Sequence, residues 1–303
     1  MKKSDHKNIW HEILSMPELK YDLLNKHVAN IARKSTFIDI ETSLIEGYMF
    51  RSGNQFIPAA NMKGTTKLLT AAWGTLYDML EEGEGGMLYF GNHHSSTFKK
   101  DPLNDVELLE HIWHVLDESD VIIAHNARFD RGWIMGRFLE LGWMLPSKFS
   151  VICTLQMLNG FNLSSKKLDE LAQTLIGSRK LETTTDLWIR CNNGDRKAFE
   201  KMQDYNIGDI YDTLFKMYLR IAQYNPDYGI DMTDRTKDYP QCKVTGDRLE
   251  VVGEWYNRSN GNSYEVYLNP NNGIQYRNRY MIPSTNRYRK SAKMYQYLLK
   301  HHV

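Results

Sequence analysis

The sequence predicts an α/β fold in which a mixed β-sheet is flanked by helices and followed by a small β-rich module. Short apolar runs separated by turn residues come first, which favours antiparallel strands. These expected strands cover residues 36–41, 47–50, 68–76 and 87–90. Amphipathic stretches then alternate with continuous apolar runs, a pattern typical of helices and strands buried on both faces. The helices are expected at 105–118, 133–141, 168–176 and 199–221, and the buried strands at 121–124 and 151–155.

The chain divides by composition into three parts. Residues 1–34 carry apolar positions at helical spacing, and Pro17 splits them into two short helices. Residues 35–230 form the expected main domain, and a change of composition near Asp231 begins a C-terminal module, 231–303. A length of 303 residues could form one large domain, or a main domain plus a small one.

The composition is that of a soluble globular protein. Hydrophobic residues make up 42% of the chain and charged residues 25%, and no apolar run approaches the length of a membrane span. The charged N-terminus has no apolar segment behind it, so no secretory signal is expected. Three widely spaced cysteines without a CxxC pair favour reduced thiols and a cytoplasmic location.

The C-terminal part is basic and rich in tyrosine. From Met232 to Val303 there are twelve Lys and Arg against six Asp and Glu, so this part carries +6 and the residues before it −5. The same part holds nine of the 18 tyrosines. Basic residues interleaved with aromatic ones suit a polyanion with stackable bases. The alternative is a Tyr-rich β module whose charge keeps it soluble, and composition alone favours neither.

The first expected strand carries two carboxylates, Asp39 and Glu41. Alternate side chains of a strand share a face, so both acids point one way and Ile38 and Ile40 point the other. Two carboxylates that lose water together repel each other unless a cation binds them. Hard divalent ions such as Mg²⁺ prefer these oxygens. An Asp-x-Glu triplet is also common on solvated strand edges, so the triplet alone does not establish a site.

Further acids lie on later elements. Asp130 follows the strand expected at 121–124, where open α/β sheets bind ligands, although a helix N-cap is the alternative role. Tyr205 and Asp209 are four residues apart on one expected helix and share a face, as many solvated surface pairs also do. The pair His93-His94 is expected in a loop, because neighbouring side chains usually diverge.

Together these residues form three motifs in order: Asp39-x-Glu41, Asn126-x-x-Phe129-Asp130 and Tyr205-x-x-x-Asp209. The set resembles the Tyr-containing (DEDDy) branch of the DEDD superfamily of 3′-5′ exonucleases, which includes the proofreading domains of DNA polymerases. The resemblance covers about residues 36–224, and stretches 69–73, 165–172 and 180–188 support it. It is closest to stand-alone exonucleases of bacteriophages, which implies a ribonuclease-H-like fold and, for a phage-encoded chain, the host cytoplasm.

The resemblance implies a metal-dependent exonuclease that removes nucleotides from DNA 3′ ends, preferably single-stranded, in replication, proofreading or repair. Two Mg²⁺ or Mn²⁺ ions, typically about 3.5–4 Å apart, stabilise the attacking and leaving oxygens in such sites. By similarity Asp39 contacts both ions. Glu41 and Asp209 bind the ion that activates water, and Asp130 supports the other. Tyr205 orients the attacking water, since a tyrosine with a pKa near ~10 is a poor base at neutral pH.

The resemblance also implies contacts with the nucleic acid. The expected substrate contacts are Thr42, Asn126, Phe129 and Lys167. Lys166 and Lys180 are more typical of solvated surface. His125 is not expected to be catalytic, because the catalytic histidine of the His-type branch occupies the position of Tyr205. It is expected to pack at the strand end or to lie near a phosphate.

The C-terminal module resembles a zinc ribbon that has lost its ligands. Similar phage proteins carry two C-x-x-C-G knuckles in this region. Three of the four ligand positions hold Tyr239, Asn269 and Asn272, and only Cys242 remains. One thiolate cannot make a tetrahedral structural site, so no zinc is expected. The basic stretch 277–293 stays a candidate for binding nucleic acid.

Two other functions stay open. One is a 3′-5′ exoribonuclease, because the sugar is recognised by local contacts that the sequence does not show. The other is a non-catalytic nucleic-acid-binding accessory protein of replication. The four acids argue against it, because clustered carboxylates repel phosphate. The expected partners are nucleic acid and replication proteins, and no membrane.

Overall fold

The computed structural model describes residues 26–48, 57–178, 183–224, 229–243, 246–257, 262–271 and 275–279. The chain divides into two compact units. The first comprises residues 1–234 and 243–246, and the second comprises residues 235–242 and 247–303. The first of the two short helices expected in residues 1–34 lies outside the described residues, and the structure describes the last part of the second as α3 (Lys26–Arg33).

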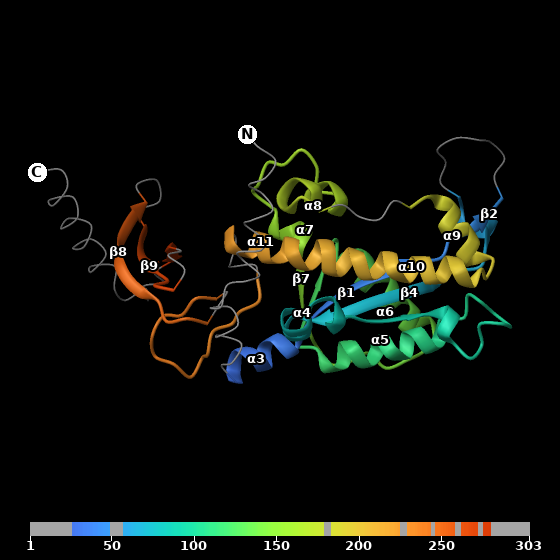
Figure 1. The fold of residues 1–303 in the computed structure, drawn as a ribbon, viewed down its shortest axis with the longest axis horizontal. Coiled ribbons are helices and arrows are strands. Elements are labelled where there is room, and N and C mark those ends of the chain that lie inside the picture. The colour runs from blue at the N-terminus through green and yellow to red at the C-terminus, as the bar shows by residue number, and fades with distance from the viewer. Residues whose placement is uncertain are drawn as a thin grey trace, which may run out of the picture. The chain divides into compact units, whose positions relative to one another are not determined.

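A mixed five-stranded sheet forms the centre of the first unit (Figure 1), which confirms the predicted α/β architecture. Its strands, in the order β5-β4-β1-β6-β7, are β5 (Leu88–Gly91), β4 (Leu68–Thr75), β1 (Ser35–Thr42), β6 (Val121–Ala124) and β7 (Ser150–Cys153). The pairs β1/β4 and β4/β5 are antiparallel, whereas β1/β6 and β6/β7 are parallel. The central strand is therefore the one that carries Asp39 and Glu41.

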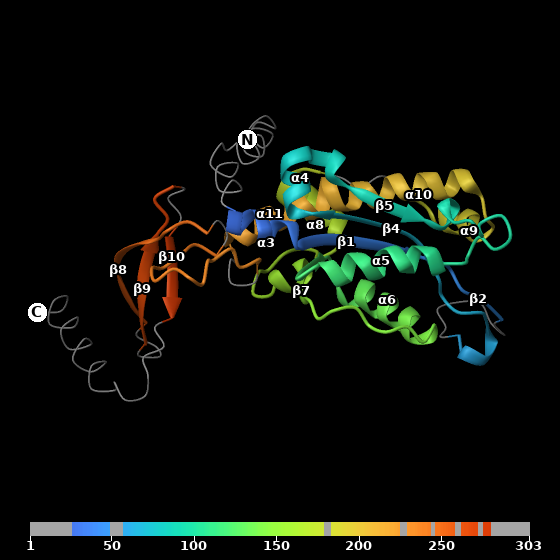
Figure 2. The same cartoon turned by 90° about the horizontal axis from the view of Figure 1, so that it is seen from below.

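Helices cover both faces of this sheet (Figures 1 and 2). The described helices are α3 (Lys26–Arg33), α4 (Leu76–Glu82), α5 (Val106–Glu118), α6 (Arg128–Glu140), α7 (Thr154–Met157), α8 (Leu168–Ile176), α9 (Thr185–Asn192), α10 (Arg196–Gly208), the π-helix η4 (Asp209–Phe215) and α11 (Lys216–Tyr224). Short 3-10 turns are η1 (Ala59–Asn61), η2 (Gly83–Gly86) and η3 (Asn92–His94). None of the described helices is long and apolar enough to cross a membrane.

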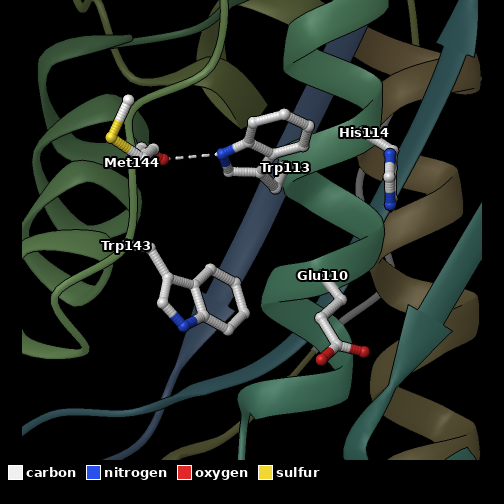
Figure 3. Close-up of a pocket in the computed structure, with 5 residues that line it drawn as sticks. All are labelled: Glu110, Trp113, His114, Trp143 and Met144. Carbon is white, nitrogen blue, oxygen red and sulfur yellow. Dashed lines mark hydrogen bonds between the residues drawn. The ribbon is translucent and has the colours of Figure 1, made fainter.

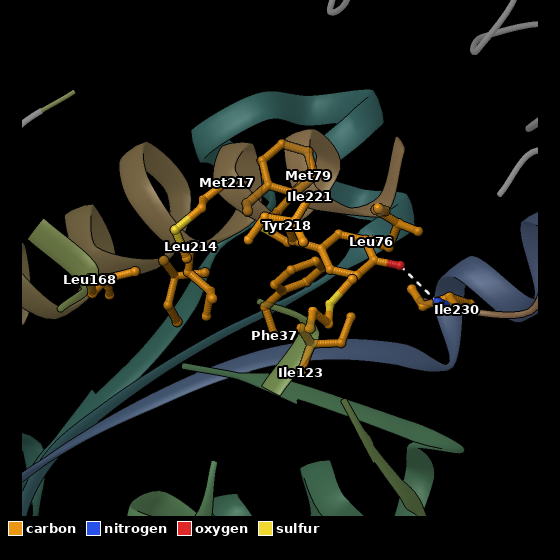
Figure 4. Packing of buried hydrophobic residues seen from close by; sticks show 14 of the residues in the cluster. Phe37, Leu76, Met79, Ile123, Leu168, Leu214, Met217, Tyr218, Ile221 and Ile230 are labelled. Atoms are coloured by element: carbon orange, nitrogen blue, oxygen red, sulfur yellow. Dashed lines mark hydrogen bonds between the residues drawn. The ribbon is translucent and has the colours of Figure 1, made fainter. Parts of the chain in front are cut away.

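The side chains of β1 alternate between two hydrophobic clusters, as predicted. Ile38 and Ile40 are buried in the cluster that contains the inner faces of α5 and α6. Phe37 points to the other face, where its ring packs edge-on against Tyr218 at 5.3 Å (Figure 4). It also packs edge-on against Phe215 at 5.7 Å. The alternation places Asp39 and Glu41 on the side of Phe37, beneath α10 and η4.

Two expected strands differ from the structure. The run at 151–155 was predicted to be buried on both faces, and this is wrong: β7 is an edge strand, and Ser150 and Val151 are exposed. The strand expected at 47–50 is reduced to β2 (Glu46–Gly47), which pairs with β3 (Met62–Lys63) outside the main sheet, and residues 49–50 lie outside the described part. An apolar run does not reveal how many neighbours a strand has.

The helical elements also differ in detail. Helices α4, α7 and α9 were not expected, and α6 begins at Arg128 rather than near residue 133. The helix expected at 199–221 is interrupted by η4, whose hydrogen bonds span five residues instead of four. The buried hydroxyl of Thr213 donates to the carbonyl oxygen of Asp209 and so satisfies the backbone at the first residue of this π-helix.

The second unit contains a three-stranded antiparallel sheet in the order β10-β9-β8. Its strands are β8 (Glu250–Asn257), β9 (Asn262–Leu268) and β10 (Gln275–Arg279). Trp255 and Tyr264 pack with their ring centroids 5.4 Å apart. The buried Asn269 donates from Nδ2 to Asp247 at 2.8 Å, and its Oδ1 accepts from the backbone N–H of Asn271 at 2.9 Å. Asn269 therefore stabilises the turn after β9, and residue 272 lies outside the described part.

Candidate metal centre

Three of the four predicted acids converge on one point of the sheet. Ligand oxygens of Asp39, Glu41 and Asp209 all lie within 4.8 Å of one another. Asp209 is buried, whereas Asp39 and Glu41 are half-buried. Within the described part of the chain, no other group of three or more His, Cys, Asp or Glu side chains is so closely spaced. We refer to these three residues as the acidic cluster.

Small neighbours on β4 leave room for the two carboxylates of β1. Ala72 lies opposite Asp39 and Thr70 opposite Glu41, and directly opposed residues of antiparallel strands share a face. Helix α10 packs over this part of β4. Its Asn206 donates from Nδ2 to Oδ2 of Asp39 at 2.5 Å. The side chain of Asp39 is thus held between the sheet and α10.

The donor set fits a hard divalent cation. All three ligands are carboxylates, which suit Mg²⁺ or Mn²⁺, and the cluster lacks the thiolate and imidazole ligands typical of structural zinc. Mg²⁺ binds oxygens at about 2.0–2.1 Å, so oxygens on opposite sides of one ion are roughly 4.2 Å apart. The cluster's spacing of up to 4.8 Å is close to that separation. A bound cation would also offset the repulsion among the three carboxylates.

Asp130 lies outside the acidic cluster as the structure shows it, but at the same end of the sheet. It is buried in the first turn of α6, which follows the carboxyl end of β6. Since β6 runs parallel to β1, this end adjoins the end of β1 that carries the acids. Asp130 also lines a small cavity together with Ile38 and Ala124. The alternative role of helix N-cap is excluded, because that position is Ala127.

Tyr205 is placed on α10 one turn before Asp209. Its ring is half-buried and packs edge-on against Trp188 of α9, with centroids 6.1 Å apart. Asp209 is the first residue of η4. The sequence predicted that Tyr205 and Asp209 share one face of a regular helix. In the structure, the α-helix changes to a π-helix between these two residues.

An open pocket lies at the start of α6. It has a volume of about 440 Å³ and is lined by Asn126, Arg128, Phe129, Gly132 and Trp133. Asn126 has a φ of 56°, in the left-handed region that asparagine tolerates better than most residues. Phe129 is 44% exposed, and its ring lies edge-on to Trp133 at 6.4 Å. An exposed aromatic ring in a pocket with an amide and a guanidinium is a suitable surface for a nucleotide base.

The segment after Thr42 is held in place by hydrogen bonds from two directions. A register shift separates Glu41 from Thr42 at the end of β1. Beyond it, Asn192 of α9 accepts from the backbone N–H of Leu44 at 3.2 Å and donates to its carbonyl at 2.8 Å. Ser43 accepts on its hydroxyl from the N–H of Lys67 at 2.9 Å. These bonds fix the backbone next to the acidic cluster.

The remaining predicted contacts have ordinary surroundings. The Lys167 side chain is 82% exposed and forms an ion pair with Glu170 at 3.5 Å. His125 has protein partners on both ring nitrogens, namely the Thr154 hydroxyl at 2.9 Å and the Lys166 carbonyl at 3.0 Å. This agrees with a packing role for His125 at the strand end. Lys180 lies outside the described residues.

The thiol of Cys191 is not suited to nucleophilic chemistry. Cys191 of α9 is buried, and burial, followed by the charge of Asp195, raises its pKa to about 12, with a smaller contribution from Glu41. It therefore stays protonated at neutral pH. Cys153 and Cys242 are also buried, and all three cysteines are free thiols.

The two neighbouring histidines form a compact 3-10 turn rather than an open loop. The rings of His93 and His94 lie 4.0 Å apart between centroids, so the expectation that they diverge is wrong. His93 is buried against Phe199 of α10, and its Nδ1 has no hydrogen-bond partner among the described residues. Burial, followed by the charges of His94 and Arg196, lowers the pKa of His93 to about 4.

This lowered pKa predicts a loss of stability in mild acid. The unfolded imidazole binds a proton near pH 6.5, whereas the folded one stays neutral down to about pH 4. The contribution of His93 is therefore complete above pH 6.5 and decreases as the pH falls, by about 2 kcal/mol between pH 7 and pH 5. In urea titrations at both pH values, His93→Leu should remove the part of the decrease in unfolding free energy that is due to His93. Replacing the exposed His114 by Gln is the control and should not remove it. An unchanged pH dependence in His93→Leu would contradict the role given to His93.

A second open pocket, of about 390 Å³, lies on the opposite side of the sheet from α10. It is lined by Glu110, Trp113, His114, Trp143 and Met144 (Figure 3). The indole Nε1 of Trp113 donates to the carbonyl of Met144 at 2.8 Å and joins α5 to the segment after α6. With a single carboxylate in its lining, this pocket does not share the donor chemistry of the acidic cluster.

The chain was also compared with known proteins. No family model matches this chain, and no curated protein sequence matches it.

Proposed function

We propose that this protein is a metal-dependent 3′-5′ exonuclease of the DEDDy type with a ribonuclease-H-like fold, acting on single-stranded DNA ends. The observation that carries the proposal is the convergence of Asp39, Glu41 and Asp209 within 4.8 Å on a half-open face of the sheet. Grouped carboxylates repel phosphate by themselves, so a protein that only binds nucleic acid gains nothing from them. The direction of cleavage rests on the resemblance of the three motifs.

The residues around the acidic cluster support hydrolysis of a phosphodiester. Asp39, Glu41 and Asp209 would hold the divalent cations, with Asp130 as a further acid at the start of α6. When bound, the cations supply Lewis-acid stabilisation of the phosphate and acidify the attacking water. Tyr205 would orient that water through its hydroxyl, one helical turn from Asp209.

The terminal nucleotide would bind next to α6. The exposed ring of Phe129 offers a stacking surface, and the side chain of Asn126 offers both a donor and an acceptor. The fixed backbone at Thr42 would border the same space. Lys167 would contact the phosphates of the longer strand, and the basic C-terminal module is a separate candidate for binding nucleic acid.

Cleavage of end-labelled oligonucleotides tests this function. DNA and RNA strands labelled at either end are incubated with Mg²⁺, Mn²⁺ or EDTA. We expect stepwise shortening of single-stranded DNA from the 3′ end, no reaction in EDTA, and loss of activity in Asp209→Asn. Asp212→Asn removes an exposed carboxylate of the same π-helix, paired with Lys216 at 2.8 Å, and should stay active. Preferred cleavage of RNA would indicate an exoribonuclease, and no shortening of either polymer would contradict the proposal.

A further inference from the structure

A buried asparagine connects the acidic cluster with β4. Asn206 follows Tyr205 on α10 and has no exposed surface. Its Nδ2 donates to Oδ2 of Asp39 at 2.5 Å, and its Oδ1 accepts from the hydroxyl of Thr70 at 3.0 Å. Thr70 is itself buried and lies opposite Glu41 across the β1/β4 pair. The hydrogen bonds therefore run from β4 through α10 to β1.

The chemistry of the three groups fixes the orientation of the amide. An ionised carboxylate only accepts hydrogen bonds, so the NH₂ group of Asn206 has to face Asp39. The amide oxygen then points to Thr70, whose hydroxyl donates to it. Turning the amide over would direct its oxygen at the carboxylate and leave buried groups without good partners, which is costly. Asp39 thus determines which end of Asn206 it meets, and Thr70 stabilises that orientation by donating to the amide oxygen.

A neutral donor suits a carboxylate that has to bind a cation. A lysine or arginine at this position would hold Asp39 as firmly, but its positive charge would compete with the divalent ion. The amide of Asn206 restricts one oxygen of Asp39 without changing the net charge of the acidic cluster. A ligand oxygen of Asp39 lies within 4.8 Å of ligand oxygens of Glu41 and Asp209.

We propose that Asn206, oriented by Thr70, is a positioning residue that holds Asp39 in the conformation that binds the divalent cation. The inference rests on the proposed function for its effect on cleavage, whereas its effect on cation binding can be measured without any nuclease assay. Partners that orient a metal ligand typically contribute about 10–100-fold to metal affinity or activity.

The test is a double-mutant cycle read by Mn²⁺ titration of the full-length protein. Asn206→Leu removes the amide at similar volume, and Thr70→Val removes only the hydroxyl. We expect Mn²⁺ affinity to fall at least about tenfold in Asn206→Leu and less in Thr70→Val. Because Thr70 acts through Asn206, its replacement should have no further effect in the Asn206→Leu background. In the cleavage assay kcat should fall while KM for DNA stays within about twofold.

Controls separate this role from a general loss of folding. Gln203→Leu removes another amide from α10, one that bonds His94 at 3.0 Å instead of the acids, and should keep wild-type Mn²⁺ affinity. Thermal melts without metal check that each variant is folded. If Asn206→Leu does not fold, the nearly isosteric Thr70→Val still tests the proposal. Wild-type Mn²⁺ affinity in both folded variants would overturn the positioning role alone. If the wild-type protein binds Mn²⁺ but does not cleave nucleic acid, only the proposed nuclease function is overturned. If it binds no Mn²⁺, both the nuclease function and the positioning role of Asn206 are overturned.

Discussion

Asp39→Asn should lower the rate of Mg²⁺-dependent cleavage by roughly a thousandfold while leaving the fold intact. Asparagine keeps the volume and one acceptor oxygen, so the hydrogen bond from Asn206 can persist. The change removes one of three negative charges that lie within 4.8 Å of one another. Loss of a metal-bound carboxylate costs several kcal/mol of charge stabilisation in the transition state, and each 1.36 kcal/mol corresponds to a factor of ten. Glu41→Gln should behave in the same way.

Although Asp39→Asn should lower activity, it should not lower the stability of the metal-free protein. Like charges held close together destabilise the folded state, so Asp39→Asn should melt at the same temperature as wild type or higher in EDTA. Mn²⁺ should raise the melting temperature of wild type by binding only to the folded chain, and should not raise that of the variant. Glu46→Gln, which removes an exposed acid paired with Lys63, is the control and should respond to Mn²⁺ like wild type. Full cleavage activity in Asp39→Asn would exclude the acidic cluster as the catalytic site.

The presence of a mixed sheet, and the face of β1 on which each side chain lies, could be predicted because they depend on the local pattern of apolar and polar residues. The alternation of Ile38, Asp39, Ile40 and Glu41 determines which side chains share a face, whatever surrounds them. The exposure of Val151 could not be predicted in this way. An apolar run is the same in the centre of a sheet and at its edge, and only the order of the strands decides between them.

The approach of Asp209 to β1 illustrates a second limit. A spacing of four residues places Tyr205 and Asp209 on one face of a helix. The sequence does not show that the helix changes to π geometry at Asp209, because the spacing of apolar residues does not specify which backbone hydrogen bonds form. π-turns occur frequently at functional sites, and here one begins at a residue of the acidic cluster.

Partners far apart in sequence were the features that the sequence could not reveal. Asn206 lies within the helix expected at 199–221, and its bond to Asp39 spans 167 positions. Asp105 looked like the start of a helix. In the structure its carboxylate does not cap α5 and instead binds Arg137 of α6. Residue type and local spacing give no information about such pairs.

Breaking the ion pair between Asp105 and Arg137 should cost about 3–5 kcal/mol of unfolding free energy. Both side chains are almost completely buried, and two hydrogen bonds of 2.8 Å join them. Asp105 also accepts from the backbone N–H of Leu68 at 3.0 Å, at the first residue of β4. The hydrogen bonds between Arg137 and Asp105 are the main reason why the pKa of Arg137 is raised. Arg137→Met leaves the buried carboxylate of Asp105 without its charged partner, and Asp105→Asn leaves Arg137 with only the more exposed Glu140.

Urea denaturation of the single and double variants measures this contribution. Replacing both partners, as in Asp105→Leu with Arg137→Met, should cost less than the sum of the single changes, because no isolated charge stays buried. The exposed pair of Lys34 and Asp120, 3.6 Å apart, is the control, and Asp120→Asn should change the free energy by less than about 1 kcal/mol. Losses of the same small size in Asp105→Asn would contradict the prediction.

The ion pair and the acidic cluster should then be separable by experiment. Arg137 packs on the side of the sheet that carries α5 and α6, whereas Asp39 and Glu41 face α10. Below its own melting temperature, Asp105→Asn should therefore bind Mn²⁺ and cleave DNA at rates close to wild type, although it unfolds at lower urea concentrations. Asp39→Asn should show the reverse, with stability kept and chemistry lost. Repulsive acids lower stability where function requires them, whereas the buried ion pair on the other face affects stability without touching the acids.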